Sequence, residues 1–340
     1  MSTTETTHGE IRRPCAKEVS PKVWLVISSY QNDRDVIRIL DHVHSLATQV
    51  LEHILIVDSH STGAIPAHLS EHGWQHVTYR SYDHNLGSGG NLCERLRLAA
   101  EGGADYAYAI NHDGGFDPEV ATTLLKAAVQ LPDLGAAYAL SFLTSAGSYN
   151  VTGTRELPLP SRLVSSPPSD ALIDVFWSSS NGALYSMTPV RKGLLPWPVM
   201  WMGWEDLEYG WRLSDNGYRQ VIVRDAVYRD NYEYQQRWFS RMIDKPAWRT
   251  YYSFRNLFLA IRRSRNRPSF YAVAAYRALL ECGLILLARD NKTRRLGRLS
   301  RGVIDGLTQD IARATEAWGE TLQNTGRSLD LQASATEQPQ

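Results

Sequence analysis

Short apolar runs alternate with amphipathic stretches through the first half of the chain. Four runs predict buried β-strands: residues 23–28, 53–58, 76–82 and 105–110. Three stretches with apolar side chains at helical spacing predict helices: residues 32–46, 87–103 and 117–131. Alternating strands and helices favour a mostly parallel sheet that helices cover on both faces. The sequence therefore predicts a mixed, mostly parallel α/β fold.

The second half of the chain follows a different pattern. Residues 136–179 predict irregular strands and loops, 204–217 a helix that ends on a glycine, and 218–223 another strand. From residue 246 to about 322 the pattern is helical. These patterns divide the chain into a disordered leader (1–20), an α/β domain (21–265), a basic amphipathic helical extension (266–323) and a disordered tail (324–340).

Charge changes this picture at one place only. The 36 basic and 36 acidic residues cancel overall, but residues 235–301 hold 16 Lys or Arg against three acids. Such segregation predicts an anionic partner, and no recognised nucleic-acid-binding module accompanies it. The most apolar window, 270–288, is interrupted by Arg277 and Glu281, so we expect no membrane-spanning helix. Three scattered cysteines and a polar start predict a cytoplasmic protein.

Polar residues follow each predicted strand of the first half. In open α/β sheets, ligands bind beyond the carboxyl ends of the strands. These positions suit a nucleotide diphosphate: Ser29, Tyr30, Asp58, Asn85, Gly87, Gly89, Asn111 and Asp113. The glycines allow backbone to approach a ligand, although a glycine-rich helix entry is also typical of a plain tight turn. Asp113 either caps a turn or holds a divalent cation that substrate phosphates share.

A second group of candidates lies where the helix of the second half begins. Glu205, Asp206 and Glu208 place three carboxylates in one helical turn, beside Trp201 and Trp204. Acids there complement the helix dipole. Tryptophans beside acids also suit a sugar ring, and one carboxylate is positioned to deprotonate an attacking hydroxyl. We therefore expect an acceptor site lined by the two tryptophans and Glu208.

With both groups placed, the chain resembles the inverting GT-A glycosyltransferases of family 2, in the rhamnosyltransferase and galactofuranosyltransferase branch. The match runs from about Val23 to Leu307. It rests on eight segments in the family's order: "VISSYQ", "ILIVDSHSTG", "NLGSGGN", "AINHDGGFDP", "SSSNGALYS", "WEDLEYGWRLSDNGYR", "WRTYYSFRN" and "RGVIDGL".

The resemblance implies a residue for each role. Asp58 contacts the nucleotide base, and Asp113 holds Mg²⁺ or Mn²⁺ through the diphosphate. Asp206 is the general base and Glu205 supports it. The implied reaction is a single in-line displacement from a nucleotide-diphosphate sugar to a hydroxyl of a glycan or polyprenyl-linked glycolipid, in cell-surface polysaccharide biosynthesis.

The chain departs from the family at two metal-binding positions. The family's first acid of the metal motif is Asn111 here, and its later histidine is Asp230, which we expect to serve as a replacement oxygen ligand. Two other classes stay open. A nucleotidyltransferase usually carries a glycine-rich basic loop after the first strand, and this chain has none there. A carbohydrate-binding scaffold without metal is favoured by Asn111 alone.

The helical extension also allows alternatives. An apolar stripe runs along it: Leu296, Leu299, Val303, Leu307 and Ile311. The stripe either packs on the domain with a solvated basic rim, binds an anionic membrane surface, or joins a second copy of the chain. A membrane role places the protein on the inner face of the cytoplasmic membrane.

Overall fold

One mixed sheet forms the centre of the molecule. The computed structural model describes residues 20–46, 50–60, 62–160, 162–230, 246–288 and 291–331. Within them the sheet has eleven strands, along the path β11-β3-β2-β1-β4-β9-β5-β10-β8, with β6 paired to β5 and β7 paired to β6. The strands are β1 (Val23–Tyr30), β2 (His53–Ser59), β3 (Val77–Tyr82), β4 (Tyr106–Asn111), β5 (Leu134–Leu143), β6 (Ser148–Val151), β7 (Arg162–Val164), β8 (Leu172–Asp174), β9 (Ala183–Ser186), β10 (Arg219–Asp230) and β11 (Arg327–Leu331).

The parallel part of the sheet brings the predicted donor residues to one edge. Strands β3, β2, β1 and β4 are parallel neighbours. Ser29 is in register with Asp58, and Ser28 with Asn111. The remaining part is less parallel than predicted, because β9 lies antiparallel between β4 and β5.

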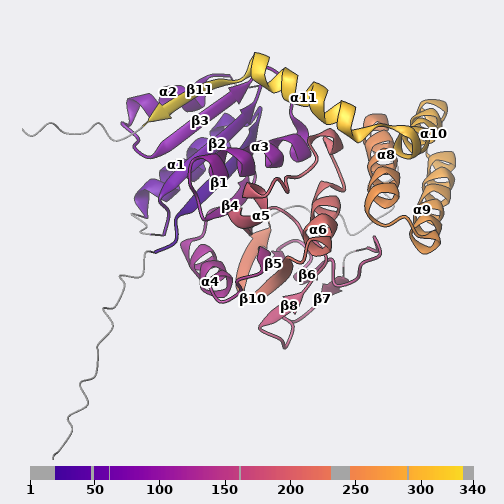
Figure 1. Cartoon of the computed structure of the whole chain (residues 1–340), viewed down its shortest axis with the longest axis horizontal. Helices are drawn as coiled ribbons and strands as arrows, with labels where there is room; N and C mark the ends of the chain where they lie inside the picture. Colours follow the sequence, from indigo (N-terminus) through magenta and orange to yellow (C-terminus); the bar gives the residue numbers. More distant parts are fainter. Residues whose placement is uncertain are drawn as a thin grey trace, which may run out of the picture.

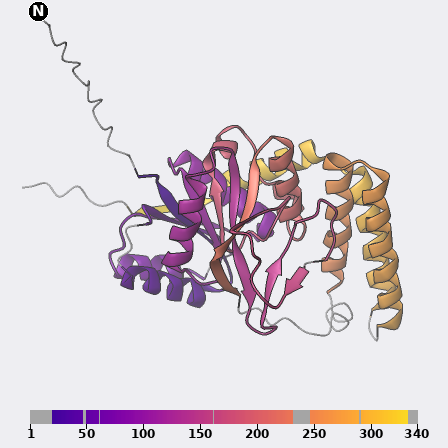
Figure 2. The same ribbon diagram turned by 90° about the horizontal axis from the view of Figure 1, so that it is seen from below.

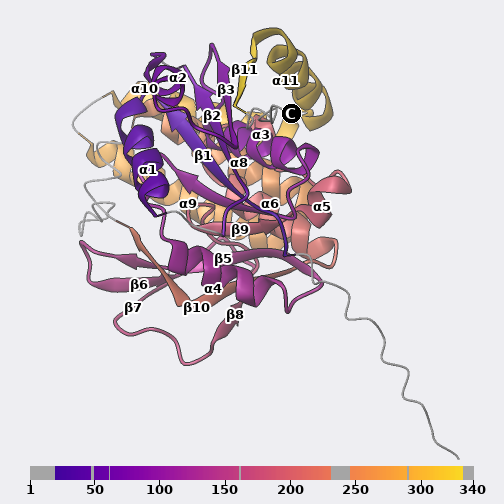
Figure 3. The same ribbon diagram turned by 90° about the vertical axis from the view of Figure 1, so that its left-hand side faces the viewer.

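Helices cover both faces of the sheet, as predicted (Figure 3). One face packs against α1 (Asp33–Ser45), α2 (Ala64–Glu71) and α4 (Pro118–Ala128). The other packs against α3 (Gly87–Glu101), α5 (Met187–Arg191) and α6 (Glu205–Asp215). A short 3-10 helix, η1 (Pro198–Met200), leads into α6. The expected mixed α/β fold with C-terminal helices is confirmed.

The C-terminal helices pack beside α6 around a third apolar cluster (Figure 1). They are α8 (Ala247–Ser264), α9 (Pro268–Leu287), α10 (Lys292–Thr308) and α11 (Ile311–Thr325). Most of the stripe predicted on the extension packs inward, since Leu299 and Ile311 are buried and Leu296 and Val303 are half-buried, whereas Leu307 is exposed. Its basic residue Arg295 is also buried and forms an ion pair with Glu281.

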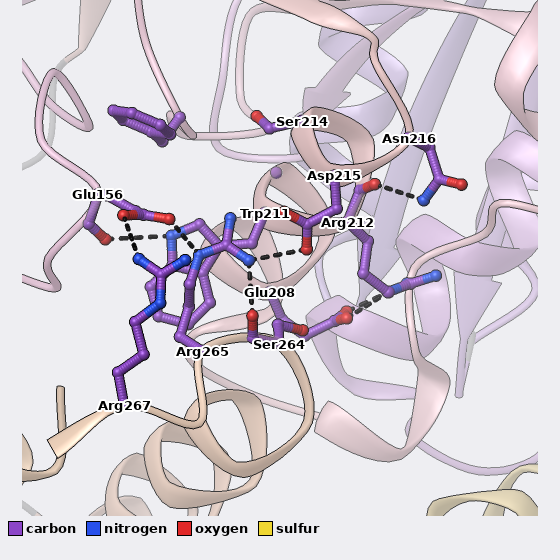
Figure 4. Close-up of polar contacts among 12 residues, drawn as sticks. Glu156, Glu208, Trp211, Arg212, Ser214, Asp215, Asn216, Ser264, Arg265 and Arg267 are labelled. Atoms are coloured by element: carbon purple, nitrogen blue, oxygen red, sulfur yellow. Dashed lines mark hydrogen bonds and ion pairs between the residues drawn. The ribbon is translucent and has the colours of Figure 1, made fainter.

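A buried arginine just after α8 joins this helix to α6 (Figure 4). Arg265 is 5% exposed and lies 2.5 Å from Glu156 and 2.7 Å from Asp215, its two carboxylate partners. Its guanidinium also covers the ring of Trp211 at 5.2 Å. Because a buried charge is costly unless it is paired, these contacts favour one orientation of α8 against α6.

The end of the chain differs from the sequence-based expectation. Residues 324–340 were expected to be disordered, but 327–331 form β11, which pairs antiparallel with β3. Helix α11 runs from the extension across the domain to this strand (Figure 1). The backbone of an edge strand such as β3 offers unpaired hydrogen-bonding groups, and the short polar segment satisfies them. The expected leader, 1–20, lies outside the described residues except for Ser20.

Candidate functional site

Asp113 and Asp206 line the same cavity. This cavity has a volume of 310 Å³ and lies where β4, β5, β10 and α6 meet. Its lining residues are Asn111, Asp113, Ala139, Ser141, Asn150, Thr152, Trp177, Ser178, Ser179, Asn181, Asp206 and Tyr228. The two aspartates are the carboxylates in this set, and they come from positions 93 residues apart in sequence.

Asp206 is held in an environment that favours its protonated form. It is the second residue of α6, and its Oδ1 is enclosed without a hydrogen-bond partner among the described residues. Burial raises the pKa of Asp206 to about 7, and the neighbouring Glu205 contributes in the same direction. A hydrogen bond from Ser180 opposes the rise. A carboxylate whose pKa lies near neutrality is suited to general-base catalysis.

A buried arginine from α3 also opposes the rise in the pKa of Asp206. Arg95 is 2% exposed, and its Nη1 donates to the carbonyl oxygens of Val26 at 3.0 Å and Ile110 at 2.9 Å. Its charge favours the ionised form of Asp206. The sequence did not indicate this role, because Arg95 lies in an ordinary amphipathic helix pattern.

The sequence did not indicate two further residues that shape the cavity, Asn181 and Tyr228. The Asn181 Oδ1 accepts hydrogen bonds from the backbone N–H of Asn111 at 3.0 Å and from the Tyr228 hydroxyl at 3.3 Å. The same hydroxyl accepts from the backbone N–H of Gly115 at 3.3 Å. Asn181 therefore fixes the turn that carries Asp113. The signal was the polar segment "SSSN" before β9.

The predicted donor residues on the other strands do not line this cavity. Asp58 is fully buried and its Oδ2 accepts a hydrogen bond from the Tyr79 hydroxyl at 2.6 Å. Ser29 is buried at the end of β1, whereas Tyr30 is exposed. A nucleotide base can reach Asp58 only if the neighbouring side chains move.

The glycine loop contacts the chain itself. The backbone N–H of Gly89 donates to the Trp201 carbonyl oxygen at 3.1 Å, and the Trp201 Nε1 donates to the Asn85 carbonyl oxygen at 3.0 Å. Gly87 has φ of +68°, and a Cβ there would collide with the Trp201 backbone. The close approach expected for a ligand is thus made by the segment before α6. Ser88 in this loop donates to Glu205.

We expect Gly87→Ala to destabilise the protein by about 2 kcal/mol or more, through both the left-handed backbone and the collision. Gly73→Ala is the matched control, because Gly73 has φ of +61° and open space around it. The difference between the two melting temperatures measures the contact with Trp201. Equal losses would show that the contact adds nothing.

The two tryptophans predicted to bind the acceptor have different environments. The Trp201 ring lies 4.7 Å from that of Tyr252 and 5.4 Å from that of Trp248, which is 41% exposed. Trp204 instead packs toward the extension, with the Arg277 guanidinium 5.1 Å above its ring.

Glu208 is not available to an acceptor. It is fully buried and its carboxylate is bound by Arg212 one helical turn later (Figure 4). This placement corrects the expectation that Glu208 lines the acceptor site: it lies on the side of α6 that faces the core, where a carboxylate needs a paired cation.

A buried asparagine positions the segment before α6. The Asn256 Nδ2 donates to the carbonyl oxygens of Met200 at 2.5 Å, Met202 at 3.0 Å and Gly203 at 2.7 Å. Asn256 is fully buried in α8, within the segment "WRTYYSFRN". It therefore joins α8 to the loop that precedes Asp206.

Asn256→Asp keeps the shape of this side chain but removes its donors and places a carboxylate against three carbonyl oxygens. We expect a loss of about 3 kcal/mol in the free energy of unfolding, measured by urea denaturation. Asn216→Asp, at an exposed helix end with a single bond to a carbonyl oxygen, is the control. A loss no larger than in the control would mean that the segment before α6 holds its conformation without Asn256.

The cavity could hold a divalent cation if substrate phosphates supplied some of its ligands. No group of three His, Cys, Asp or Glu side chains among the described residues could hold a metal alone. Asp113 is exposed to the cavity, and Mg²⁺ is commonly bound through one or two carboxylates together with phosphates. The backbone of Asp230 pairs with Leu143, but its side chain, the expected second ligand, lies outside the described residues.

A second cavity lies away from these residues. It has a volume of 650 Å³ and is lined by residues of α3, α6 and α11, among them Arg97, Arg212 and Trp318. None of the predicted site residues lines it. Although this cavity is larger, its lining holds a single carboxylate, that of Glu316. It therefore lacks the pair of carboxylates that the reaction needs.

No family model and no curated protein matches this chain. Solved structures with a similar arrangement include the mannosyltransferase PcManGT from Pyrobaculum calidifontis, in complex with GDP-Man and Mn²⁺, with 15% identity and a TM-score of 0.48 over 90% of this chain and 81% of that chain. Residues 1–349 of S. aureus TarS give 12% identity and 0.46 over 89% and 81%. Their UDP complex gives 13% identity and 0.46 over 88% and 91%. Since these TM-scores are below 0.5, the functional argument rests on the cavity.

Proposed function

We propose that this chain is a glycosyltransferase that transfers a sugar from a nucleotide-diphosphate donor to a hydroxyl group, with inversion at the anomeric carbon. The observation that carries the proposal is the cavity shared by Asp113 and Asp206, in which burial raises the pKa of Asp206 to about 7. The order of the eight sequence segments supports a rhamnosyl- or galactofuranosyl-type enzyme of cell-surface polysaccharide assembly, acting in the cytoplasm.

In this proposal Asp206 receives the proton of the acceptor hydroxyl while that oxygen forms a bond to the anomeric carbon. The bond between this carbon and the diphosphate oxygen breaks in the same step, and the nucleoside diphosphate leaves. Asp113 would hold Mg²⁺ or Mn²⁺ together with the donor phosphates, and the cation would supply charge neutralisation for the leaving group. Asn181 holds the turn of Asp113, and Ser180 holds the carboxylate of Asp206.

A screen of nucleotide sugars tests the proposal. The chain is incubated with UDP-, GDP- and dTDP-sugars in the presence of Mg²⁺ or Mn²⁺. Slow hydrolysis of each donor is measured through the nucleotide product that it releases. We expect release of a nucleoside diphosphate from at least one donor. Release of pyrophosphate from a sugar phosphate and a nucleoside triphosphate would instead identify a nucleotidyltransferase. Absence of any binding of nucleoside diphosphates with Mn²⁺ would favour a carbohydrate-binding scaffold.

A further inference from the structure

The outer face of α9 exposes apolar side chains. Every exposed residue from 272 to 287 is apolar or glycine: Ala272, Ala275, Tyr276, Leu279, Gly283, Leu286 and Leu287. Tyr276, Leu279, Leu286 and Leu287 are 66%, 72%, 59% and 67% exposed. At 100° per residue these four side chains fall within an arc of about 100°, so they form one continuous face. A water-facing helix usually has the opposite pattern.

The charged residues of α9 face the protein. The Arg277 Nε donates to the Pro158 carbonyl oxygen at 3.1 Å, and its guanidinium covers Trp204. Glu281 is 3% exposed and forms an ion pair with Arg295 of α10. By length and composition alone, α9 is long and apolar enough to cross a membrane, and 28% of its most apolar 18-residue stretch is buried. These polar contacts tie one side of α9 to its neighbours and leave the other as a surface.

A basic rim lies beside this apolar face. Helix α10 begins just after the end of α9 and exposes Lys292, Arg294, Arg298 and Arg301 on its first turns. Within the described ranges, only the last of these four has an ion-pair partner, Asp305. The C-terminal half of α10 adds two exposed apolar side chains, Ile304 at 54% and Leu307 at 40%.

The exposed apolar residues gather at one end of the molecule. Nine large hydrophobic residues are exposed in the described part of the chain, and seven of them lie on α8, α9 and α10: Trp248, Tyr276, Leu279, Leu286, Leu287, Ile304 and Leu307. Figure 2 shows these helices side by side, with their long axes roughly parallel. Apolar surface concentrated in this way is typical of an interaction site.

We propose that the outer face of α9 and the basic start of α10 form a docking surface for an anionic lipid bilayer. Apolar side chains enter the boundary between headgroups and acyl chains, and the arginines and lysine bind anionic headgroups. A second copy of the chain fits less well, because a two-fold contact through this surface would bring the two basic rims together. A nucleic acid would leave the leucines without a partner. This surface is separate from the cavity of Asp113 and Asp206.

Sedimentation with vesicles tests this surface on the full-length chain. We expect the protein to pellet with phosphatidylglycerol vesicles at 50 mM salt, and at least about tenfold less with phosphatidylcholine vesicles. Leu279→Gln/Leu286→Gln is expected to lower binding to anionic vesicles at least tenfold, and Arg294→Glu/Arg298→Glu to remove the preference for anionic lipid. The matched controls are Val129→Gln, at an exposed valine of the domain, and Arg34→Glu/Lys126→Glu, with the same change in charge.

Two results would overturn the proposal: no binding of the wild-type chain to phosphatidylglycerol vesicles, or binding that both pairs of substitutions leave intact. Self-association without lipid that Leu279→Gln/Leu286→Gln abolishes, with no vesicle binding, would assign the face to a second copy. Circular dichroism melts confirm that each variant folds. Nucleoside diphosphate binding in solution is expected to stay unchanged in all of them, so failure here leaves the transfer reaction untouched.

Discussion

We expect Asp206→Asn to lower kcat for the proposed sugar transfer by about 10²–10⁴-fold, the range expected when a general base is removed. Asparagine keeps the size of the side chain but cannot take the acceptor proton. In the wild-type chain, we expect kcat/KM to rise as pH increases through about 7, because Asp206 must lose its proton to act. We expect kcat/KM of the variant to show no such rise near pH 7. Initial rates between pH 5.5 and 9 measure both effects.

The same substitution is expected to stabilise the protein at pH 8. Since burial raises the pKa of Asp206 above its value in the unfolded chain, the folded protein binds this proton more tightly. The resulting stability is present at pH below about 4 and is lost as pH rises through about 7. Asparagine carries no charge at pH 8, so we expect the melting temperature there to rise by at least about 3 °C.

Melting curves at pH 5 and pH 8 separate the effect of removing the Asp206 charge from any change in side-chain packing. The gain in melting temperature is expected at pH 8 and should be smaller at pH 5, where Asp206 of the wild type is already protonated. Asp133→Asn, at an exposed carboxylate before β5, serves as the control. Asp206 is not the general base if the Asp206→Asn variant keeps full activity, or if its kcat/KM still rises as pH increases through about 7.

Asp113→Ala is expected to lower the affinity for a nucleoside diphosphate in Mn²⁺ by about 100-fold, and kcat with it. A cation shared between a carboxylate and phosphates contributes several kcal/mol, and Asp113 is the exposed carboxylate in the cavity. Without metal, the wild type and the variant should bind the nucleotide equally. Isothermal titration with and without Mn²⁺ measures the coupling.

Asp133→Ala is the control for this experiment, since it removes the same charge far from the cavity lining. If Asp113→Ala retained the full manganese dependence of the wild type, the cation would have to be held elsewhere. Asp230→Ala then becomes the informative variant, because we expect Asp230 to replace the family's histidine as a second oxygen ligand. Manganese dependence unchanged by Asp230→Ala would remove that assignment.

The first half of the fold could be predicted because its signals are local. A buried parallel strand such as β1 is a continuous apolar run, and α4 carries proline in its first turn. By contrast, β5 lies mostly inside the region where irregular strands and loops were expected, and no regular strand was predicted there. Its ten residues include small alanines that are equally compatible with other structures, and pairing with distant β9 and β10 selects the strand.

The site could be predicted only where a motif specifies a role. The acids at 113 and 206 were placed correctly in one cavity because strand-end and helix-start positions converge in this fold. What the loops contact could not be read from the sequence. The glycine loop binds the Trp201 backbone and most of the extension's apolar stripe faces inward, and both depend on contacts between residues far apart in the chain. Glu208 faces the core and pairs with Arg212.

Anomalous diffraction from a crystal of the protein with Mn²⁺ and a bound nucleoside diphosphate tests the central claim most directly. We predict a manganese peak bonded to the Asp113 carboxylate and to the diphosphate, within the cavity that Asp206 also lines. Manganese and diphosphate bound in the 650 Å³ cavity beside α11, or anywhere that Asp206 does not face, would contradict it.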